Sequence, residues 1–275
     1  MTLADALCDA ENAGLPRHEA RMLLLHALGQ PTHARAWLLA HDGDALAPAC
    51  AERFSALAAR RLRGEPVAYL TGRKDFHGLT LQIDARVLDP RDDTETLVDW
   101  ALDLLPPGQP AHVLDLGTGS GAIALAIAHA RPAARVWAVD ASADALAVAQ
   151  GNAERLGLPV ALRHGDWFAP VADEAFDVVA SNPPYIAAGD AHLPALRHEP
   201  RQSLVSGADG LDDLRRIVAG APAHLRPGGW LLLEHGWDQA AAVRALLAGA
   251  GFEDVASRRD LAGIERCSGG RWRGV

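Results

Sequence analysis

The sequence has little of what disulfide-stabilised, zinc-binding and membrane proteins need. Its three cysteines, Cys8, Cys50 and Cys267, are scattered and odd in number, so neither a disulfide framework nor a metal site is expected. The longest uninterrupted apolar run, Ala122 to Ala128, is far shorter than the roughly 20 residues that cross a bilayer, and no basic stretch followed by an apolar one opens the chain. We therefore expect a cytoplasmic protein with no membrane partner.

The chain also has no excess of basic residues. Its 26 Lys and Arg stand against 35 Asp and Glu, which gives a net charge of −9. Affinity for nucleic acid depends on neutralising phosphates, so this balance argues against a protein that wraps bare duplex, and we expect no direct nucleic-acid partner. The 275 residues, 49% of them hydrophobic, are enough for one large globular domain and a small one.

A small helical bundle is predicted over residues 1–64. Apolar residues recur there at helical spacing in four short stretches, which glycine and proline separate. Thr2 is placed to cap the first helix, and the fourth begins after Pro48. Because no residue of the bundle is typical of catalysis, we interpret it as a partner-docking module.

Residues 65–90 predict a linker that contains a β-hairpin, because apolar residues around Leu81 alternate as they do in a strand. The polar run from Asp89 to Glu95 then enters a helix. Thr94 and its acidic neighbours suit the N-terminus of that helix, where negative charge is favoured. Arg91 stands among these carboxylates, as expected if it holds a pocket loop in place.

Residues 91–275 predict an α/β domain. From Ala111 onward, short apolar strands alternate with helices, which is typical of a mainly parallel sheet with helices on both faces. The predicted strands are 112–116, 135–139, 160–163, 177–180, 230–234 and 253–256. Ligands of such sheets bind at the carboxyl ends of the strands, where the strand order reverses.

A glycine-rich loop follows the first of these strands. It begins after Asp115 and Leu116 and leads straight into a helix. The loop consists of Gly117, Thr118, Gly119, Ser120 and Gly121. Its glycines let the backbone approach a ligand closely. Taken alone, the loop fits a dinucleotide site, a site for a nucleoside joined to methionine, or a bare tight turn.

Further side chains at strand ends narrow the ligand to a nucleoside. Asp140 ends the second strand, where its carboxylate can accept hydrogen bonds from both ribose hydroxyls. Asp166 and Trp167 follow the third strand and combine a carboxylate with a flat ring, which suits the binding of an adenine. The alternative for Trp167 is a place in the hydrophobic core.

The tetrapeptide Asn182–Tyr185, the NPPY turn, ends the fourth predicted strand. Two consecutive prolines fix φ and donate no backbone hydrogen bonds, so the turn is stiff and can aim a side chain. The carboxamide of Asn182 both donates and accepts, as the recognition of an amide or an aromatic amine requires. A simple strand-ending turn is the alternative. If the ligand were a nicotinamide dinucleotide, this turn would have no role. If the ligand is S-adenosyl-L-methionine, the turn has one.

The NPPY turn and the glycine-rich loop resemble those of methyltransferases that modify planar amide or amine nitrogens. Further stretches resemble one family, the release factor glutamine methyltransferases (PrmC/HemK). These stretches are Glu65 to Gly72, Pro90 and Arg91, Asp93 to Glu95, Arg197 with Glu199 and Pro200, and Leu232 to Gly236. Asp89 and Asp92 depart from the residues usual in the family, which concerns the geometry of the local loop.

The resemblance implies a Rossmann-like class I methyltransferase fold, with a mainly parallel seven-stranded sheet and a helical N-terminal domain. It implies transfer of a methyl group from S-adenosyl-L-methionine to the side-chain N5 of the glutamine in the Gly-Gly-Gln motif of class 1 peptide chain release factors, by a monomeric enzyme. A ribosomal-protein glutamine methyltransferase and an adenine-N6 nucleic-acid methyltransferase are the alternatives.

The resemblance also implies roles for particular residues. Catalysis would depend on Asn182, Pro183 and Tyr185, and Pro184 and Glu199 would join them in binding the substrate. The residues expected to bind the cofactor are Asp115, Gly117, Thr118, Gly119, Ser120, Gly121, Asp140, Asp166, Trp167 and Asn182. For Glu199, contact with the substrate and support of the turn are equal alternatives, and for His235 structural pairing is favoured over a place in the pocket.

Overall fold

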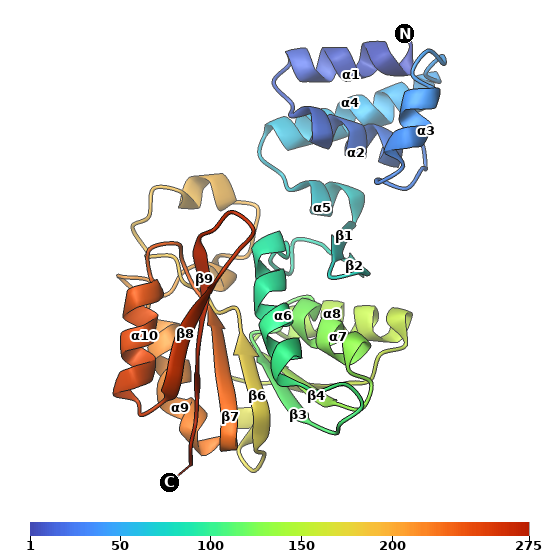
Figure 1. The fold of residues 1–275 in the computed structure, drawn as a ribbon. Helices are drawn as coiled ribbons and strands as arrows, with labels where there is room; N and C mark the ends of the chain where they lie inside the picture. The colour runs from blue at the N-terminus through green and yellow to red at the C-terminus, as the bar shows by residue number, and fades with distance from the viewer. Residues whose placement is uncertain (275) are drawn as a thin grey trace. The chain divides into compact units, whose positions relative to one another are not determined.

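The computed structural model describes residues 1–274, which form two compact units, one from Met1 to Arg73 and one from Lys74 onward (Figure 1). The division into 1–64, 65–90 and 91–275 stays a prediction. None of the helices within the described residues is long and apolar enough to cross a membrane.

The first unit is a bundle of short helices. They are α1 (Leu3–Asn12), α2 (Arg17–Ala27), α3 (Arg35–Ala40), α4 (Pro48–Leu62) and α5 (Val67–Thr71). Thr2 caps α1 reciprocally: its hydroxyl accepts from the Asp5 amide at 3.1 Å, and the Asp5 carboxylate accepts from the Thr2 amide at 2.8 Å. The helices enclose a core around Leu23, Leu24 and Leu25, which are fully buried.

The four helices that the sequence predicts are present, and α5 is an additional one within the predicted linker. Pro66 precedes its first turn, and Gly72 ends it in the left-handed conformation at φ 69°. Five residues are too few for an independently stable helix, so packing against α2 and α4 must hold it. The predicted hairpin follows as β1 (Arg73–Phe76) and β2 (Leu79–Gln82).

The second unit is built on a seven-stranded sheet with the order β5-β4-β3-β6-β7-β9-β8. Its strands are β3 (His112–Leu116), β4 (Arg135–Asp140), β5 (Val160–His164), β6 (Phe176–Ser181), β7 (Leu225–Glu234), β8 (Glu253–Arg259) and β9 (Glu265–Arg271). Only β9 runs against the others, so the predicted mainly parallel sheet is confirmed. The chain proceeds outward from β3 to β5 and then returns to β6 on the other side of β3, so the order reverses between β3 and β6.

Helices cover both faces of this sheet, as the alternating pattern predicts (Figure 1). One face carries α6 (Glu95–Leu104), which follows a short 3-10 turn η1 (Asp92–Thr94), together with α7 (Ala122–Ala130) and α8 (Ala143–Leu156). The other face carries α9 (Asp212–Gly220) and α10 (Ala240–Gly249).

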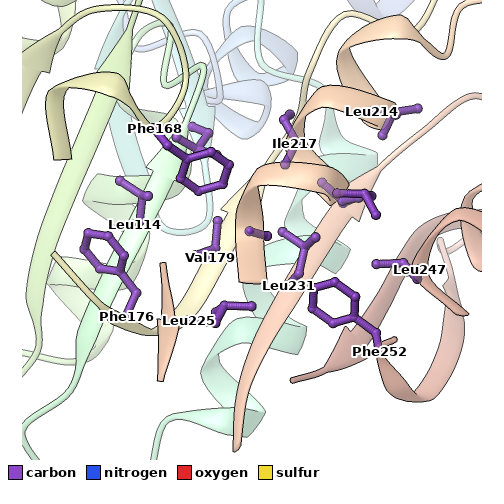
Figure 2. Close-up of a cluster of buried hydrophobic side chains, with 14 of the residues drawn as sticks. Leu114, Phe168, Phe176, Val179, Leu214, Ile217, Leu225, Leu231, Leu247 and Phe252 are labelled. Carbon is purple, nitrogen blue, oxygen red and sulfur yellow. The ribbon is translucent and has the colours of Figure 1, made fainter. Parts of the chain in front are cut away.

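A continuous apolar cluster joins the sheet to α9 and α10 (Figure 2). The cluster includes Val179 and Leu231 of the central strands, Ile217 of α9 and Leu247 of α10, and all four side chains are fully buried. Burial of one such side chain stabilises the fold by about 1.5–3 kcal/mol. The strands whose carboxyl ends carry the predicted site are therefore held in a well-packed core.

The strand β9 is absent from the pattern of apolar strands in the sequence, because its interior contains Gly269 and Gly270. Close packing explains these glycines. A Cβ atom at Gly269 would lie 2.6 Å from Leu232 Cδ2 and 2.8 Å from the Leu231 carbonyl oxygen. One at Gly270 would lie 2.8 Å from Phe252 Cβ. Glycine therefore lets β9 fit between neighbours that leave no room for a side chain.

We predict that Gly269→Ala lowers the free energy of unfolding by about 1–3 kcal/mol, because the added methyl overpacks the sheet. Urea unfolding of the full chain measures the change. The matched control is Gly151→Ala in α8, where nothing lies within 4 Å of the added Cβ. That variant should instead gain about 0.5–1 kcal/mol from higher helix propensity. A Gly269→Ala variant as stable as the wild type would contradict the packing explanation.

Candidate active site

The glycine-rich loop is fixed to the end of the neighbouring strand. The amides of Gly117 and Thr118 both donate to the carbonyl oxygen of Val139 in β4, at 2.9 and 3.0 Å. Gly117 and Gly119 have φ values of 70° and 55°, which favour glycine. The loop therefore keeps one conformation at the carboxyl end of β3, where backbone can approach a ligand.

Asp115 supports this loop from inside the protein. It is fully buried, and its Oδ2 accepts from the Thr118 hydroxyl at 2.6 Å and from the Ala124 amide at 3.2 Å. Its Oδ1 has no hydrogen-bond partner among the described residues. Burial raises the pKa of Asp115 to about 7, although the two donated hydrogen bonds oppose the rise.

Asp140 holds the loop from the end of β4. Its Oδ2 accepts from the Gly119 amide and its Oδ1 from the Ser142 amide, both at 2.8 Å. Burial raises the pKa of Asp140, and these two donors act in the opposite direction. Because a carboxylate oxygen can accept more than one hydrogen bond, Asp140 keeps capacity for the hydroxyls of a bound ligand.

A cavity of about 260 Å³ lies between the glycine-rich loop and the NPPY turn. The predicted cofactor-binding residues that line it are Gly117, Gly119, Asp140, Asp166, Trp167 and Asn182. Pro184 of the predicted substrate set also lines it. The other predicted cofactor residues, Asp115, Thr118, Ser120 and Gly121, are buried and are not among its lining residues.

Trp167 has its ring in the wall of this cavity, at the edge of the apolar cluster. A Cβ atom at Gly117 would lie 3.5 Å from the ring, so the ring stands directly beside the loop. The neighbouring Asp166 is exposed and forms an ion pair with Arg216, which also lines the cavity. Trp167 therefore both lines the cavity and packs against the hydrophobic core, so the two alternatives for this residue are compatible.

The NPPY turn is joined to the glycine-rich loop through their two strands. The Ser181 hydroxyl at the end of β6 donates to the Leu116 carbonyl at the end of β3, at 2.7 Å. Asn182 Nδ2 donates to the Thr94 hydroxyl oxygen at 3.2 Å, and within the described residues no hydrogen bond reaches Asn182 Oδ1. Pro183 is buried, so the turn cannot relax outward.

Tyr185 is not among the residues that line the first cavity; it lines a second one of about 440 Å³. Its hydroxyl donates to Glu234 Oε1 at 3.4 Å, and its carbonyl oxygen accepts from Gln239 Nε2 at 3.0 Å. The residues lining the second cavity are Lys74, Arg91, Asp92, Asp93, Tyr185, Glu234 and Arg266. The NPPY turn therefore contributes to two neighbouring cavities.

Arg91 braces the loop that follows the NPPY turn. It donates to Glu199 Oε1 at 2.6 Å and lies 3.6 Å from a carboxylate oxygen of Asp89. Glu199 is 8% exposed and lines neither cavity, which agrees with support of the turn rather than contact with a ligand. Asp89 thus supplies Arg91 with a second carboxylate, and Asp92 pairs with Lys74 at 2.7 Å.

Thr94 lies at the N-terminus of α6, as the sequence predicts, but sequence reasoning missed its contact with Asn182. Thr94 makes no side-chain cap hydrogen bond; it is 3% exposed, and its hydroxyl oxygen accepts from Asn182 Nδ2 instead. Its neighbours also reach other elements: Asp93 pairs with Arg266 at 3.2 Å, and Glu95 accepts from the His77 amide at 2.7 Å. The signal in the sequence that could have pointed to Thr94 is the stretch Asp93 to Glu95, which resembles the corresponding stretch of the family.

His235 has a structural place, as the sequence favours. It is fully buried next to Glu234. Its Nε2 lies 2.8 Å from the Ser268 hydroxyl, and its Nδ1 lies 2.9 Å from the Gly236 carbonyl oxygen. Both ring nitrogens are therefore occupied within the protein.

Comparison with known proteins connects this geometry to a family. Residues 3–72 match the family model of the PrmC N-terminal domain, and residues 95–208 match that of the methyltransferase small domain. A release factor glutamine methyltransferase of Bordetella pertussis is 55% identical over 271 residues, which cover 98% of each chain. The chain belongs to the release factor glutamine methyltransferase family.

Another member of the family, from Xylella fastidiosa, is 52% identical over 272 residues and 98% of each chain. Among solved structures, the 16S rRNA methyltransferase RsmC of T. thermophilus, in complex with AdoMet and guanosine, aligns with a TM-score of 0.54. The two sequences are 23% identical, and the alignment covers 73% of this chain and 50% of the RsmC chain. This likeness confirms the Rossmann-like class I methyltransferase fold of the family.

The buried carboxyl of Asp115 predicts a pH-dependent stability. Its pKa is about 7 in the folded protein against an ordinary value of 3.8, so the folded state keeps a proton that the unfolded state releases between these values. The contribution of Asp115 to stability is therefore lost as the pH rises toward 7. Relative to Asp115→Asn, which does not titrate, the wild type should lose at least about 1 kcal/mol between about pH 5 and pH 8.

Denaturant unfolding of both proteins across this pH range measures the difference, and groups common to the two proteins cancel in it. If the free energy of unfolding of the wild type does not fall relative to that of Asp115→Asn over this range, Asp115 is already ionised at pH 5 in the folded state.

Proposed function

We propose that this protein transfers a methyl group from S-adenosyl-L-methionine to the side-chain N5 of the glutamine in the Gly-Gly-Gln motif of class 1 peptide chain release factors. The full-length relatives at 55% and 52% identity are release factor glutamine methyltransferases, which supports the substrate. The observation that carries the proposal is that Asn182 lines the same cavity as Gly117, Gly119 and Asp140. An amide-binding group and a nucleoside-binding loop thus face one space.

The cavity residues fit the parts of this cofactor. Asp140, with acceptor capacity left after two backbone bonds, would bind the ribose hydroxyls. Trp167 and Asp166 would hold the adenine, and the backbone at Gly117 and Gly119 would lie against the ligand. The predicted residues Asp115, Thr118, Ser120 and Gly121 would act from behind: Asp115 and Thr118 bond to each other, and the Ser120 carbonyl accepts from Asn152 at 3.0 Å.

When bound, the cofactor supplies an electrophilic methyl group on a positively charged sulfur. The amide nitrogen of glutamine is a weak nucleophile, because its lone pair is delocalised into the carbonyl. Asn182 Oδ1 and the Pro183 carbonyl oxygen would accept its two hydrogens and fix the nitrogen in line with that methyl group. These hydrogens become more positive as the nitrogen reacts, so the two acceptors stabilise the transition state more than the ground state.

The remaining residues of the turn would keep this geometry. Pro184 makes the turn rigid, Tyr185 provides a wall toward the second cavity, and Glu199 braces the following loop through Arg91. Positioning of this kind contributes on the order of 7 kcal/mol at its limit. The chain then needs no general base, because the methylated product can lose its proton to water.

We also propose that the enzyme acts as a cytoplasmic monomer and that its helical N-terminal unit helps to dock the release factor. The net charge of −9 supports a protein partner rather than a nucleic acid. Because translation factors work in the cytoplasm, the proposed substrate supports this location.

Incubation with labelled S-adenosyl-L-methionine tests the substrate. The acceptors are a purified class 1 release factor, the same factor with its Gly-Gly-Gln glutamine replaced, ribosomal protein and DNA. We predict label on the intact release factor alone. Label on the replaced factor, on ribosomal protein or on DNA would overturn the proposal and identify the alternative.

Replacing Asn182 tests the mechanism. We predict that Asn182→Ala lowers kcat on the release factor roughly 100-fold or more, because an acceptor aimed at developing charge is lost. Equilibrium binding of the cofactor should change little, since Asp140, Trp167 and the loop are intact. The contrasting variant Asp140→Asn should weaken cofactor binding instead. Turnover by Asn182→Ala close to that of the wild type would rule out the hydrogen-bonding role.

A further inference from the structure

The carboxamide of Asn182 is useful only in one of its two orientations. To accept a hydrogen from the substrate amide, its oxygen must face the substrate. After a 180° rotation of the carboxamide, its NH2 group would meet the NH2 group of the substrate, and neither can accept from the other. Something in the protein must therefore select the orientation, because oxygen and nitrogen of a carboxamide have nearly the same shape.

Thr94 is the group that meets Asn182 on its inner side. It stands where η1 passes into α6, is 3% exposed, and receives a hydrogen bond from Asn182 Nδ2 at 3.2 Å. A threonine hydroxyl can donate as well as accept, so this contact alone would fit either orientation of the carboxamide. In the structure the hydroxyl accepts from Nδ2, and the charge of Glu234 favours this orientation.

Glu234, at the end of β7, is the carboxyl group on which Thr94 acts. The Thr94 side chain lowers the pKa of Glu234, which is the effect of a hydroxyl that turns its proton toward the charged form. The hydroxyl of Tyr185 also donates to Glu234, at 3.4 Å. The other charged groups that act on Glu234 are Asp93 and Arg266, and burial raises its pKa to about 7.

The charge of Glu234 bears on the direction of the Thr94 hydroxyl. When Glu234 is ionised, its oxygens accept only, so they favour a Thr94 hydroxyl whose single proton turns toward them. The hydroxyl oxygen is then left to accept, and from Asn182 it can accept only from the NH2 group. The carboxamide oxygen of Asn182 remains as the free acceptor at the cavity that Asn182 lines.

We propose that Thr94 is a positioning residue of the methyl transfer, which holds the productive orientation of the Asn182 carboxamide by accepting a hydrogen bond from Asn182 Nδ2. The inference rests on the proposed function. Thr94 touches neither substrate nor cofactor, and it acts through Asn182 alone. Its removal should therefore affect the rate of the chemical step more than the binding of either reactant.

Thr94→Val tests the proposal, because it keeps the shape of the side chain and removes the hydroxyl. We expect kcat on the release factor to fall about tenfold, and KM and cofactor affinity to change less than about twofold. Thr94→Ser, which restores the hydroxyl, should return kcat to near the wild-type value. The matched control is Thr80→Val, at an exposed position of the hairpin where the hydroxyl donates to Asp75, and it should leave kcat unchanged.

A double-mutant cycle with Asn182→Ala separates positioning from a general loss of structure. If Thr94 acts through Asn182, the variant with both substitutions should be as slow as Asn182→Ala alone. Three results would overturn the inference: wild-type kcat in Thr94→Val, a Thr94→Ser variant as slow as Thr94→Val, or an equal further loss from Thr94→Val in the Asn182→Ala background. Failure of the wild type to methylate the release factor would instead overturn the proposed function.

Discussion

The parallel pairing of β3 with β6 is the constraint on which the site depends. The two strands are neighbours although β4 and β5 come between them in the sequence, and Leu116 pairs with Ser181 at their carboxyl ends. This pairing places the glycine-rich loop beside the NPPY turn. A reversal of strand order creates a ligand cleft in any open α/β sheet. Here it brings the glycine-rich loop, which we propose binds the cofactor, next to Asn182, which we propose binds the substrate amide.

Buried and half-buried carboxyl groups support both sides of this cleft. Asp115 and Asp140 accept hydrogen bonds from the glycine-rich loop, and Glu234 accepts one from the Tyr185 hydroxyl of the NPPY turn. Burying a charged group is costly unless it is hydrogen-bonded, so these carboxylates hold their donors in place. The raised pKa values of Asp115 and Glu234 reflect that cost. A site that works by positioning requires such support.

The sequence predicts the elements with strong patterns and misses those that depend on tertiary packing. The parallel strands and the four bundle helices follow from periodicity. The strand β9 does not, because its glycines are required by close packing against Leu232 and Phe252 and have low strand propensity. The cavity residues follow from strand ends and glycines. Thr94 could not be found in this way, because its partner Asn182 is distant in sequence and meets it only in the folded domain.

The central claim is that Asn182 binds the reacting amide directly. A crystal structure of the protein with S-adenosylhomocysteine, the demethylated form of the cofactor, and a glutamine peptide of the release factor tests it most directly. The account predicts that Asn182 Oδ1 lies about 3 Å from the glutamine amide nitrogen, with that nitrogen facing the sulfur. A glutamine bound elsewhere, or an Asn182 carboxamide that turns its nitrogen toward the substrate, would contradict it.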